Sequence, residues 1–152
     1  MKKDFIILGP INSIKYNDMF PYIMSREVFV KAPNDNLLST GTLFIDNKGD
    51  KVRVPCVWYS NLDSKHLYRK IELTKTYSAD LYPKYDNYDA INVDKIKDIP
   101  KDYSGVMGVP ITAVVLSPEQ IEIINVLKGR GDAKINGIRK FARIGIKLKN
   151  SE

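Results

Sequence analysis

Short apolar runs separated by polar turns predict a chain built from strands and short helices. The run from Phe5 to Leu8 ends at Gly9-Pro10 and is typical of a strand buried on both faces, as in a parallel sheet. The next segment, 11–24, combines candidate capping residues with apolar residues at helical spacing. It therefore predicts a short helix.

Residues 43–59 place two β-rich runs around a glycine-containing turn, which predicts a hairpin. Side chains alternate along a strand with period two. Four residues of the second strand are expected on one face: Val52, Val54, Cys56 and Trp58. Pro55 has no N–H, which favours an edge or a bulge.

Two further segments have helical signals. Residues 60–73 offer Asp63 or Ser64 as a cap before apolar residues at helical spacing. The stronger signal is at 117–129, where Ser117-Pro118 and Gln120 form a capping box before an apolar stripe that ends at glycine. This second segment is predicted to be the clearest helix.

Helix and strand signals fade between residues 77 and 108, and five of the nine tyrosines fall there. A loop of this length is usually functional or disordered, and its aromatic content argues for order. Gly105 and Gly108 are expected to permit positive φ in a tight turn. Pro110 is expected to precede a strand, 111–116.

The C-terminal segment contains Asn136-Gly137, the strongest two-residue hairpin signal. In the arm that follows, apolar and basic residues alternate. A strand with one packed face and one basic face suits contacts with phosphates. The apolar side is expected to comprise Ala142, Ile144, Ile146 and Leu148, and the other side Phe141, Arg143, Lys147 and Lys149.

The length of 152 residues fits one domain, 1–152, with a real core. The fold class expected is α/β, or an α+β fragment, with β-hairpins, a few helices and a long ordered loop at 77–108. No apolar run reaches ~18 residues, so a cytoplasmic location without a membrane is expected. One cysteine and one histidine predict neither a disulfide nor a metal site.

Charge is concentrated at the C-terminal end. From Lys128 onward there are eight basic residues against Asp132 and Glu152, which accounts for the whole net charge of +6. The first 127 residues carry 16 charges of each sign. Such an excess favours a polyanion such as DNA as partner, although a solubilising basic tail is an equal alternative on charge alone.

Several segments of the sequence resemble those of a known protein family: WYSNLD (58–63), YPKYDNYDAINVDKIKDIP (82–100), YSGVMGVPIT (103–112), SPEQIEI (117–123) and FARIGIK (141–147). In content, order and spacing they resemble the carboxyl-terminal half of the EcoRI-type adenine-specific DNA methyltransferases. Residues 4–23 resemble the strand and helix that follow that family's catalytic motif. The resemblance therefore covers nearly the whole chain.

The resemblance implies a mostly parallel methyltransferase-like sheet and transfer of a methyl group from S-adenosylmethionine to adenine N6. The target base must leave the duplex stack to react. In the family an Asn-Pro-Pro-Phe type tetrapeptide holds that base, and no such tetrapeptide occurs in this chain. The isolated chain is therefore expected to bind no S-adenosylmethionine tightly, to have no catalytic residue and to be inactive.

The remaining residues receive candidate roles in binding double-stranded DNA. Basic candidates are Arg139, Lys140, Arg143, Lys147 and Lys149. In the loop, Asn87, Tyr88 and Asn92 either order the backbone or contact DNA, since an Asn amide can pair with adenine. Trp58 and Tyr59 are candidates for stacking on the extruded base; Trp58 is more often hairpin core, which favours Tyr59.

Two functions remain open from the sequence. The first is the C-terminal, target-recognition part of an N6-adenine DNA methyltransferase of a restriction-modification type system, which needs a separate catalytic half. The second is a non-catalytic DNA-binding protein derived from such an enzyme. A neighbouring polypeptide with the Asn-Pro-Pro-Phe motif would favour the first.

Overall fold

The computed structural model describes residues 3–31, 42–62, 68–127, 133–140 and 143–149. The chain divides into two compact units, Met1–Leu67 (unit 1) and Tyr68–Glu152 (unit 2). The expectation of one domain stays a prediction. None of the described helices is long and apolar enough to cross a membrane.

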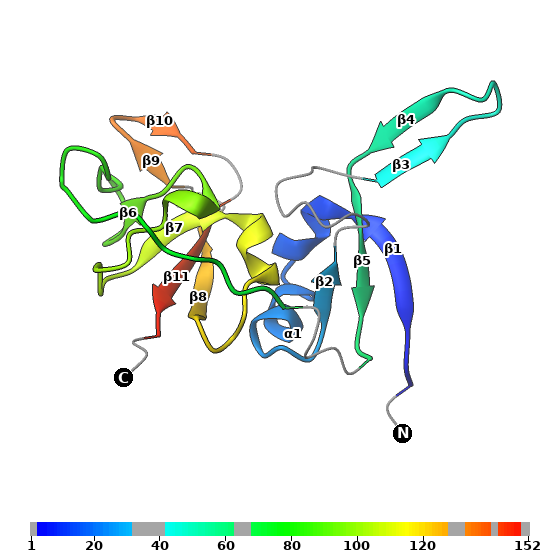
Figure 1. Cartoon of the computed structure of the whole chain (residues 1–152), viewed down its shortest axis with the longest axis horizontal. Helices are drawn as coiled ribbons and strands as arrows, with labels where there is room; N and C mark the ends of the chain where they lie inside the picture. Colours follow the sequence, from blue (N-terminus) through cyan, green and yellow to red (C-terminus); the bar gives the residue numbers. More distant parts are fainter. Residues whose placement is uncertain (1–2, 32–41, 63–67, 128–132, 141–142, 150–152) are drawn as a thin grey trace. The chain divides into compact units, whose positions relative to one another are not determined.

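Unit 1 contains a three-stranded antiparallel sheet in the order β1-β5-β2 (Figure 1). The strands are β1 (Ile6–Pro10), β2 (Phe29–Lys31) and β5 (Cys56–Ser60). Strand β5 lies in the centre and pairs with both neighbours. Gly9 lets the β1 backbone approach the Tyr59 ring, because an added Cβ would lie 3.1 Å from Tyr59 Cε2.

The prediction for 5–8 is partly right. Ile6 to Leu8 lie in strand β1, whereas Phe5 precedes it. β1 is an antiparallel edge strand, and Ile6 and Ile7 are 61% and 54% exposed. Burial on both faces is therefore wrong for the described residues.

The predicted short helix in 11–24 is confirmed. It consists of a 3-10 turn, η1 (Ile11–Lys15), and the helix α1 (Phe20–Met24), with Pro21 in its first turn. Phe20 and Ile23 are buried, as expected for residues three apart on one helix face.

The predicted hairpin is also confirmed, as a two-stranded ribbon of β3 (Thr42–Ile45) and β4 (Lys51–Val54). The chain does not run on as one strand, because Pro55 separates β4 from β5 and the two join different sheets. The predicted shared face is wrong for this reason: Val52, Val54 and Trp58 are exposed, whereas Cys56 is buried.

Unit 2 is built on a four-stranded sheet in the order β6-β7-β11-β8. The strands are β6 (Ile91–Asn92), β7 (Met107–Pro110), β8 (Ile121–Leu127) and β11 (Arg143–Leu148). Among the strand pairs of the described residues, β6–β7 is the only parallel one. A mixed fold of small sheets is therefore present, and the expected mostly parallel sheet is not confirmed.

The segment predicted as the clearest helix is strand β8. Ser117 does organise a turn, since its Oγ accepts the Glu119 N–H and its carbonyl accepts the N–H groups of Gln120 and Ile121. The four β-branched residues that follow, at 121, 123, 124 and 126, favour a strand over a helix. Pairing with β11 decides the outcome.

Two other predictions need correction. The strand expected at 111–116 is a buried 3-10 turn, η4 (Ile111–Val115), which follows directly after Pro110 of β7. The helix expected at 60–73 lies partly outside the described residues. Where it is described, Arg69 makes a β-bridge to Leu116 instead.

The Asn136-Gly137 hairpin is confirmed as β9 (Lys134–Ile135) and β10 (Ile138–Arg139). Both turn residues have positive φ, 50° and 76°, as this turn type requires. Strand β11 does not continue the hairpin but occupies the inside of the four-stranded sheet.

The long loop before β7 is ordered, as predicted. It includes only β6 and the turn η3 (Ile96–Asp98) as regular elements. The Tyr77 ring lies 6.0 Å from that of Tyr82 and 4.7 Å from that of Tyr103, and the Tyr82 hydroxyl donates to the Asp98 carbonyl. Aromatic packing therefore replaces regular hydrogen bonding here.

Candidate nucleic-acid interface

Strand β11 has one apolar face and one polar face. Ile144 and Ile146 are fully buried, while Lys147 is exposed. Arg143, Gly145 and Lys147 lie on the opposite face because side chains alternate along the strand. The predicted alternation is confirmed for residues 143–148, and Phe141 and Ala142 lie outside the described residues.

The polar face is built around a row of four paired residues, one from each strand. Asn92 pairs with Gly108, Gly108 with Gly145, and Gly145 with Asn125. The two glycines make room for polar groups: a Cβ on Gly108 would lie 2.2 Å from Tyr85 Oη, and one on Gly145 2.2 Å from Asn125 Oδ1. Gly108 is therefore required for close approach, and the predicted positive φ is wrong, since only Gly49 and Gly137 have it among the described glycines.

Asn92 is the centre of a hydrogen-bond network on this face. Its Oδ1 accepts the Tyr85 hydroxyl at 2.7 Å and Arg143 Nε at 3.3 Å, and its Nδ2 donates to Asp94 Oδ1 at 2.9 Å. Asn92 is 3% exposed. These contacts favour the ordering role for Asn92 over the DNA contact, because both ends of the amide already have partners.

Asp94 is held between the amide of Asn92 and two cations. The Asn92 hydrogen bond, followed by the charges of Lys140 and Arg143, lowers the pKa of Asp94 below its ordinary value of 3.8. The distances to Asp94 Oδ1 are 3.2 Å from Arg143 Nη2 and 3.7 Å from Lys140 Nζ. Two of the five basic candidates thus share one carboxylate.

Tyr85 joins this network from the core of unit 2. Its ring belongs to a small core cluster with Ala90, Leu127 and Ala133, against which Tyr88 also packs. Burial raises the pKa of the Tyr85 hydroxyl, so it stays a neutral donor at physiological pH.

The loop also anchors the β9–β10 hairpin, which carries Arg139 and precedes Lys140. The Asp86 carboxylate accepts the N–H groups of Asn136 (3.0 Å) and Gly137 (2.7 Å), and Asn87 Oδ1 accepts the Lys134 N–H at 3.2 Å. Asn87 therefore has an ordering contact, and its predicted contact with DNA remains a prediction.

The basic candidates are not gathered at one point. Arg139 is exposed on β10, and Lys140 and Arg143 meet at Asp94. Lys147 lies opposite Glu122, and Lys149 follows the end of β11. From Arg143 to Lys149 the backbone spans roughly 20 Å at ~3.3 Å per residue, so the cations form a strip along one strand.

The two aromatic candidates in unit 1 are placed in the reverse of the expected way. Tyr59 is 2% exposed, its hydroxyl donates to the Pro10 carbonyl at 2.6 Å, and burial raises its pKa to about 12. Trp58 is 38% exposed on the other side of β5. Tyr59 is therefore core, and Trp58 is the more exposed residue of the pair.

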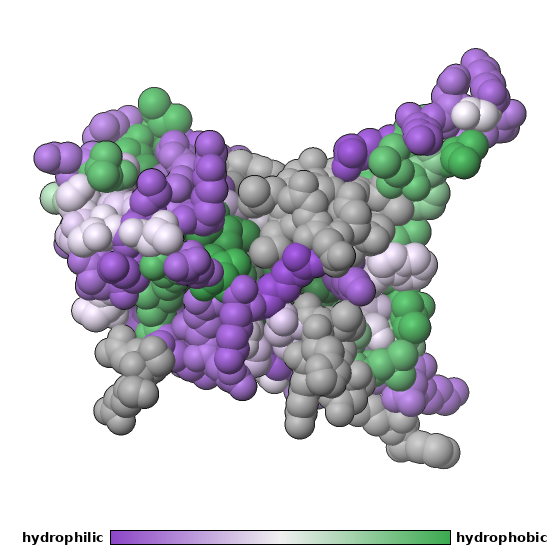
Figure 2. All heavy atoms as spheres, in the orientation of Figure 1, coloured by the Kyte–Doolittle hydropathy of each residue, from purple (hydrophilic) through white to green (hydrophobic). Residues whose placement is uncertain are grey.

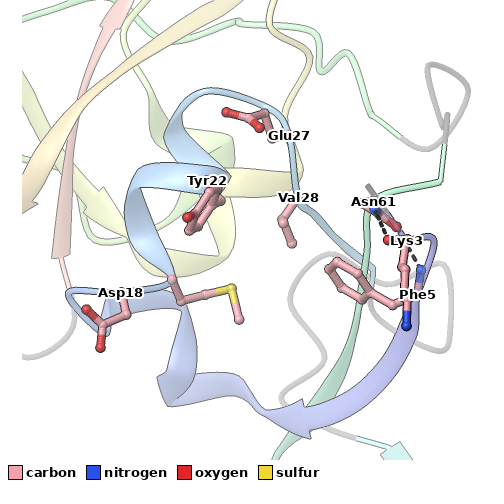
Figure 3. Close-up of a pocket in the computed structure, with 8 residues that line it drawn as sticks. Lys3, Phe5, Asp18, Tyr22, Glu27, Val28 and Asn61 are labelled. Atoms are coloured by element: carbon pink, nitrogen blue, oxygen red, sulfur yellow. Dashed lines mark hydrogen bonds between the residues drawn. The ribbon is translucent and has the colours of Figure 1, made fainter. Parts of the chain in front are cut away.

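Unit 1 also has a hollow of about 290 Å³ between α1 and the start of β1 (Figure 3). Phe5, Met19, Tyr22 and Val28 make much of its lining. The Asn61 amide already has hydrogen-bond partners, since it accepts the Phe5 N–H and donates to the Lys3 carbonyl.

In the described part of the chain, no three His, Cys, Asp or Glu side chains lie close enough to share a metal.

Sequence reasoning missed the anchoring residues Tyr85, Asp86 and Asp94. The available signal was the Asn136-Gly137 turn, because adjacent N–H groups with positive φ form an anion-binding nest. An acidic residue is needed to fill it, but the sequence does not show that Asp86, fifty residues away, does so.

Comparison with known proteins places this geometry in context. Residues 1–151 match the family described as "Adenine-specific methyltransferase EcoRI". The chain is 40% identical over 166 residues to the Type II methyltransferase M.EcoRI of Escherichia coli. The alignment covers 97% of this chain and 51% of that protein. No solved structure matches the chain with significance.

Two mycoplasma proteins are similar at lower identity. They are the Type II methyltransferases M.MgeORF184P of Mycoplasma genitalium and M.MpnI of Mycoplasma pneumoniae, each 28% identical. The alignments cover 95% and 98% of this chain, and 57% and 58% of those proteins. The chain thus spans a little over half the length of the curated relatives it matches.

Proposed function

From the premise that this chain belongs to the EcoRI adenine-specific methyltransferase family, we propose that it is the DNA-binding and target-recognition part of an N6-adenine DNA methyltransferase. The enzyme would serve a restriction-modification type system. Its catalytic tetrapeptide would be supplied by polypeptide outside this chain, since no Asn-Pro-Pro-Phe type sequence occurs in it.

The observation that carries this proposal is the two-faced strand β11. Its buried face fixes it inside the sheet of unit 2, and its polar face presents cations along one line. Phosphate contacts position a protein on a duplex without reading its sequence. The strip is therefore assigned to the DNA backbone, with Lys147 and Lys149 as its exposed members, and the exposed Arg139 on β10 is assigned the same role.

Arg143 and Lys140 receive a different role. Because Asp94 takes up much of their charge, they hold the loop 84–94 and the hairpin in place rather than bind phosphate strongly. Asn87 and Tyr88 are proposed to meet DNA from this ordered loop. Trp58 is proposed to stack on the extruded base, a contact worth ~1 to 3 kcal/mol.

The methyl donor is not assigned to a site in this chain. The hollow of unit 1 is mainly apolar, and its charged lining residues, Lys3, Asp18 and Glu27, are no basis for placing the donor there. No step of the reaction is therefore derived through it.

The proposal predicts a specific salt dependence. Replacing Arg139, Lys147 and Lys149 by Gln should weaken binding to an adenine-containing duplex about tenfold or more. It should also reduce the slope of log K against log salt by up to about 2.7, or ~0.9 per phosphate contact. Titrations by fluorescence anisotropy at several salt concentrations measure both quantities.

The matched control removes the same charge from the loop before β7 by changing Lys95, Lys97 and Lys101 to Gln. All three are exposed, so affinity and slope should stay close to those of the unchanged chain. An equal loss in both triple variants would show that net charge alone governs binding and would count against the strip.

A further inference from the structure

Strand β1 is an exposed edge strand of the unit 1 sheet. It has one neighbour, β5, within the described residues, and Figure 1 shows it along the outside of the unit 1 sheet. Natural edge strands are usually protected by charge, proline, bulges or a covering element. Here Pro10 lies at the end of the strand, and the residues that begin it are Ile6-Ile7-Leu8. Figure 2 shows hydrophobic surface where β1 lies.

The backbone groups on the free edge can be identified from the register. The Phe5 N–H donates to Asn61 Oδ1 and the Ile11 N–H to the Pro55 carbonyl, both toward β5. Backbone direction alternates along an antiparallel strand, so Ile7 and Gly9 also point toward β5. Ile6 and Leu8 therefore point their N–H and C=O groups away from it.

We propose that this free edge binds an extended segment of the methyltransferase polypeptide that lies outside this chain, adding a strand beside β1. The inference rests on the proposed function. The segment would hydrogen-bond to Ile6 and Leu8 and would cover the side chains of Ile6 and Ile7. Strand addition of this kind draws affinity from the main chain and specificity from side-chain contacts.

Two observations favour this occupant over others. The curated relatives extend well beyond the aligned stretch, with 42% to 49% of their lengths unmatched, from coverages of 58% to 51%. The sequence pattern of 5–8 also predicts a strand buried on both faces, whereas the structure leaves it exposed. A strand supplied by the remaining polypeptide reconciles the pattern with the structure.

The experiment uses the full chain and, as partner, the part of Escherichia coli M.EcoRI outside the aligned stretch, expressed separately. Amide hydrogen exchange followed by NMR should show fast exchange at Ile6 and Leu8 in the chain alone. Adding the partner should slow both by about tenfold or more, as new hydrogen bonds form. Ile7 and Gly9, already bonded to β5, should change less. Binding without protection at Ile6 and Leu8 would overturn the inference, and so would failure of the partner to bind.

Substitutions test the same edge by affinity. Leu8→Pro removes an outward N–H without removing a bond to β5, and Ile7→Lys places a charge on the edge. Each should weaken partner binding about tenfold or more. Ile45→Lys on β3 is the matched control, because Ile45 is 74% exposed in the same unit, and it should leave binding unchanged. Equal weakening in all three would overturn the inference. If Leu8→Pro prevents folding, as judged by circular dichroism, Ile6→Lys replaces it.

Two further readouts separate the alternatives. A dimer of the chain alone that Leu8→Pro abolishes would make a second copy the occupant and would overturn the proposal. Methyl transfer is measured on the same mixtures. Methylation restored while the edge variants bind normally would support the proposed function and overturn this inference. Protection of Ile6 and Leu8 without methylation would support this inference and count against the proposed function.

Discussion

Unit 1 and unit 2 differ most in how much apolar surface they leave in water. Among the described residues, two large hydrophobic side chains are exposed in unit 2, Leu81 and Ile138. In unit 1 there are twelve: Ile6, Ile7, Tyr16, Tyr22, Met24, Leu43, Phe44, Ile45, Val52, Val54, Trp58 and Leu62. Single exposed hydrophobic residues are ordinary, but a concentration of them marks an interaction surface.

The difference lies in what the strands expose, because each unit has edge strands and a two-stranded ribbon among the described residues. In unit 2 the apolar face of β11 is covered, and the ribbon β9–β10 exposes one large hydrophobic residue, Ile138. In unit 1 the outer strand β1 exposes Ile6 and Ile7, and the ribbon β3–β4 exposes five large hydrophobic residues. Unit 2 therefore buries its apolar side chains and presents polar groups to solvent. Unit 1 leaves apolar side chains exposed, as expected for a surface that binds a partner.

The largest predicted effect tests the core of unit 2. Ile144→Ala removes a fully buried side chain and should lower the free energy of unfolding by about 2 to 5 kcal/mol. Ile7→Ala, on the exposed edge of unit 1, should change it by less than about 0.5 kcal/mol. Urea denaturation followed by circular dichroism measures both. Similar losses from the two variants would remove the contrast between the units.

A smaller loss is expected at Gly108, which tests the packing under the polar face. An added Cβ would overlap the Tyr85 hydroxyl, so Gly108→Ala should displace that ring and cost about 1 to 3 kcal/mol of unfolding free energy. Ser104→Ala, at an exposed position in the loop before β7, is the control and should be nearly neutral. An unchanged unfolding free energy in Gly108→Ala would show that the Tyr85 ring does not depend on close packing against Gly108.

The smallest predicted effect concerns pH. Because the folded-state pKa of Asp94 is lowered, its carboxylate stabilises the fold above the ordinary pKa of 3.8, and this contribution is lost as pH falls through the folded value. Asp94→Asn should therefore lower stability modestly at pH 7, less than about 1 kcal/mol because the side chain is 62% exposed.

The difference between Asp94→Asn and the unchanged chain should vanish in acid, below the folded pKa. Denaturation midpoints measured from pH 7 down to pH 2 follow it, with Asp80→Asn as an exposed control. A difference that persists unchanged at pH 2 would mean that Asp94 acts through its shape rather than its charge.

The sequence indicated correctly those elements whose signal is local. The Asn136-Gly137 turn, the hairpin at 43–59 and the alternation of Arg143 to Leu148 depend on neighbours in the chain, and all three are confirmed. Family membership was also recognisable from long segments such as 82–100, and the family match over residues 1–151 confirms it.

The errors came from effects that act over long sequence separations. The capping signal at Ser117 predicted a helix, but pairing of β8 with β11 overrode it. The period-two argument for Trp58 ignored the break at Pro55, so Tyr59 and Trp58 were exchanged. The roles of Gly108, Asp86 and Asp94 depend on partners 23 to 51 residues away, which no local pattern reveals.

The most direct test of the account is methyl transfer by the chain itself. The purified chain is incubated with labelled S-adenosylmethionine and an adenine-containing duplex that it binds, and adenine N6 methylation is measured. We predict no methylation by the chain alone, and methylation when polypeptide carrying the Asn-Pro-Pro-Phe motif is added. N6-methyladenine formed by the chain alone would contradict it.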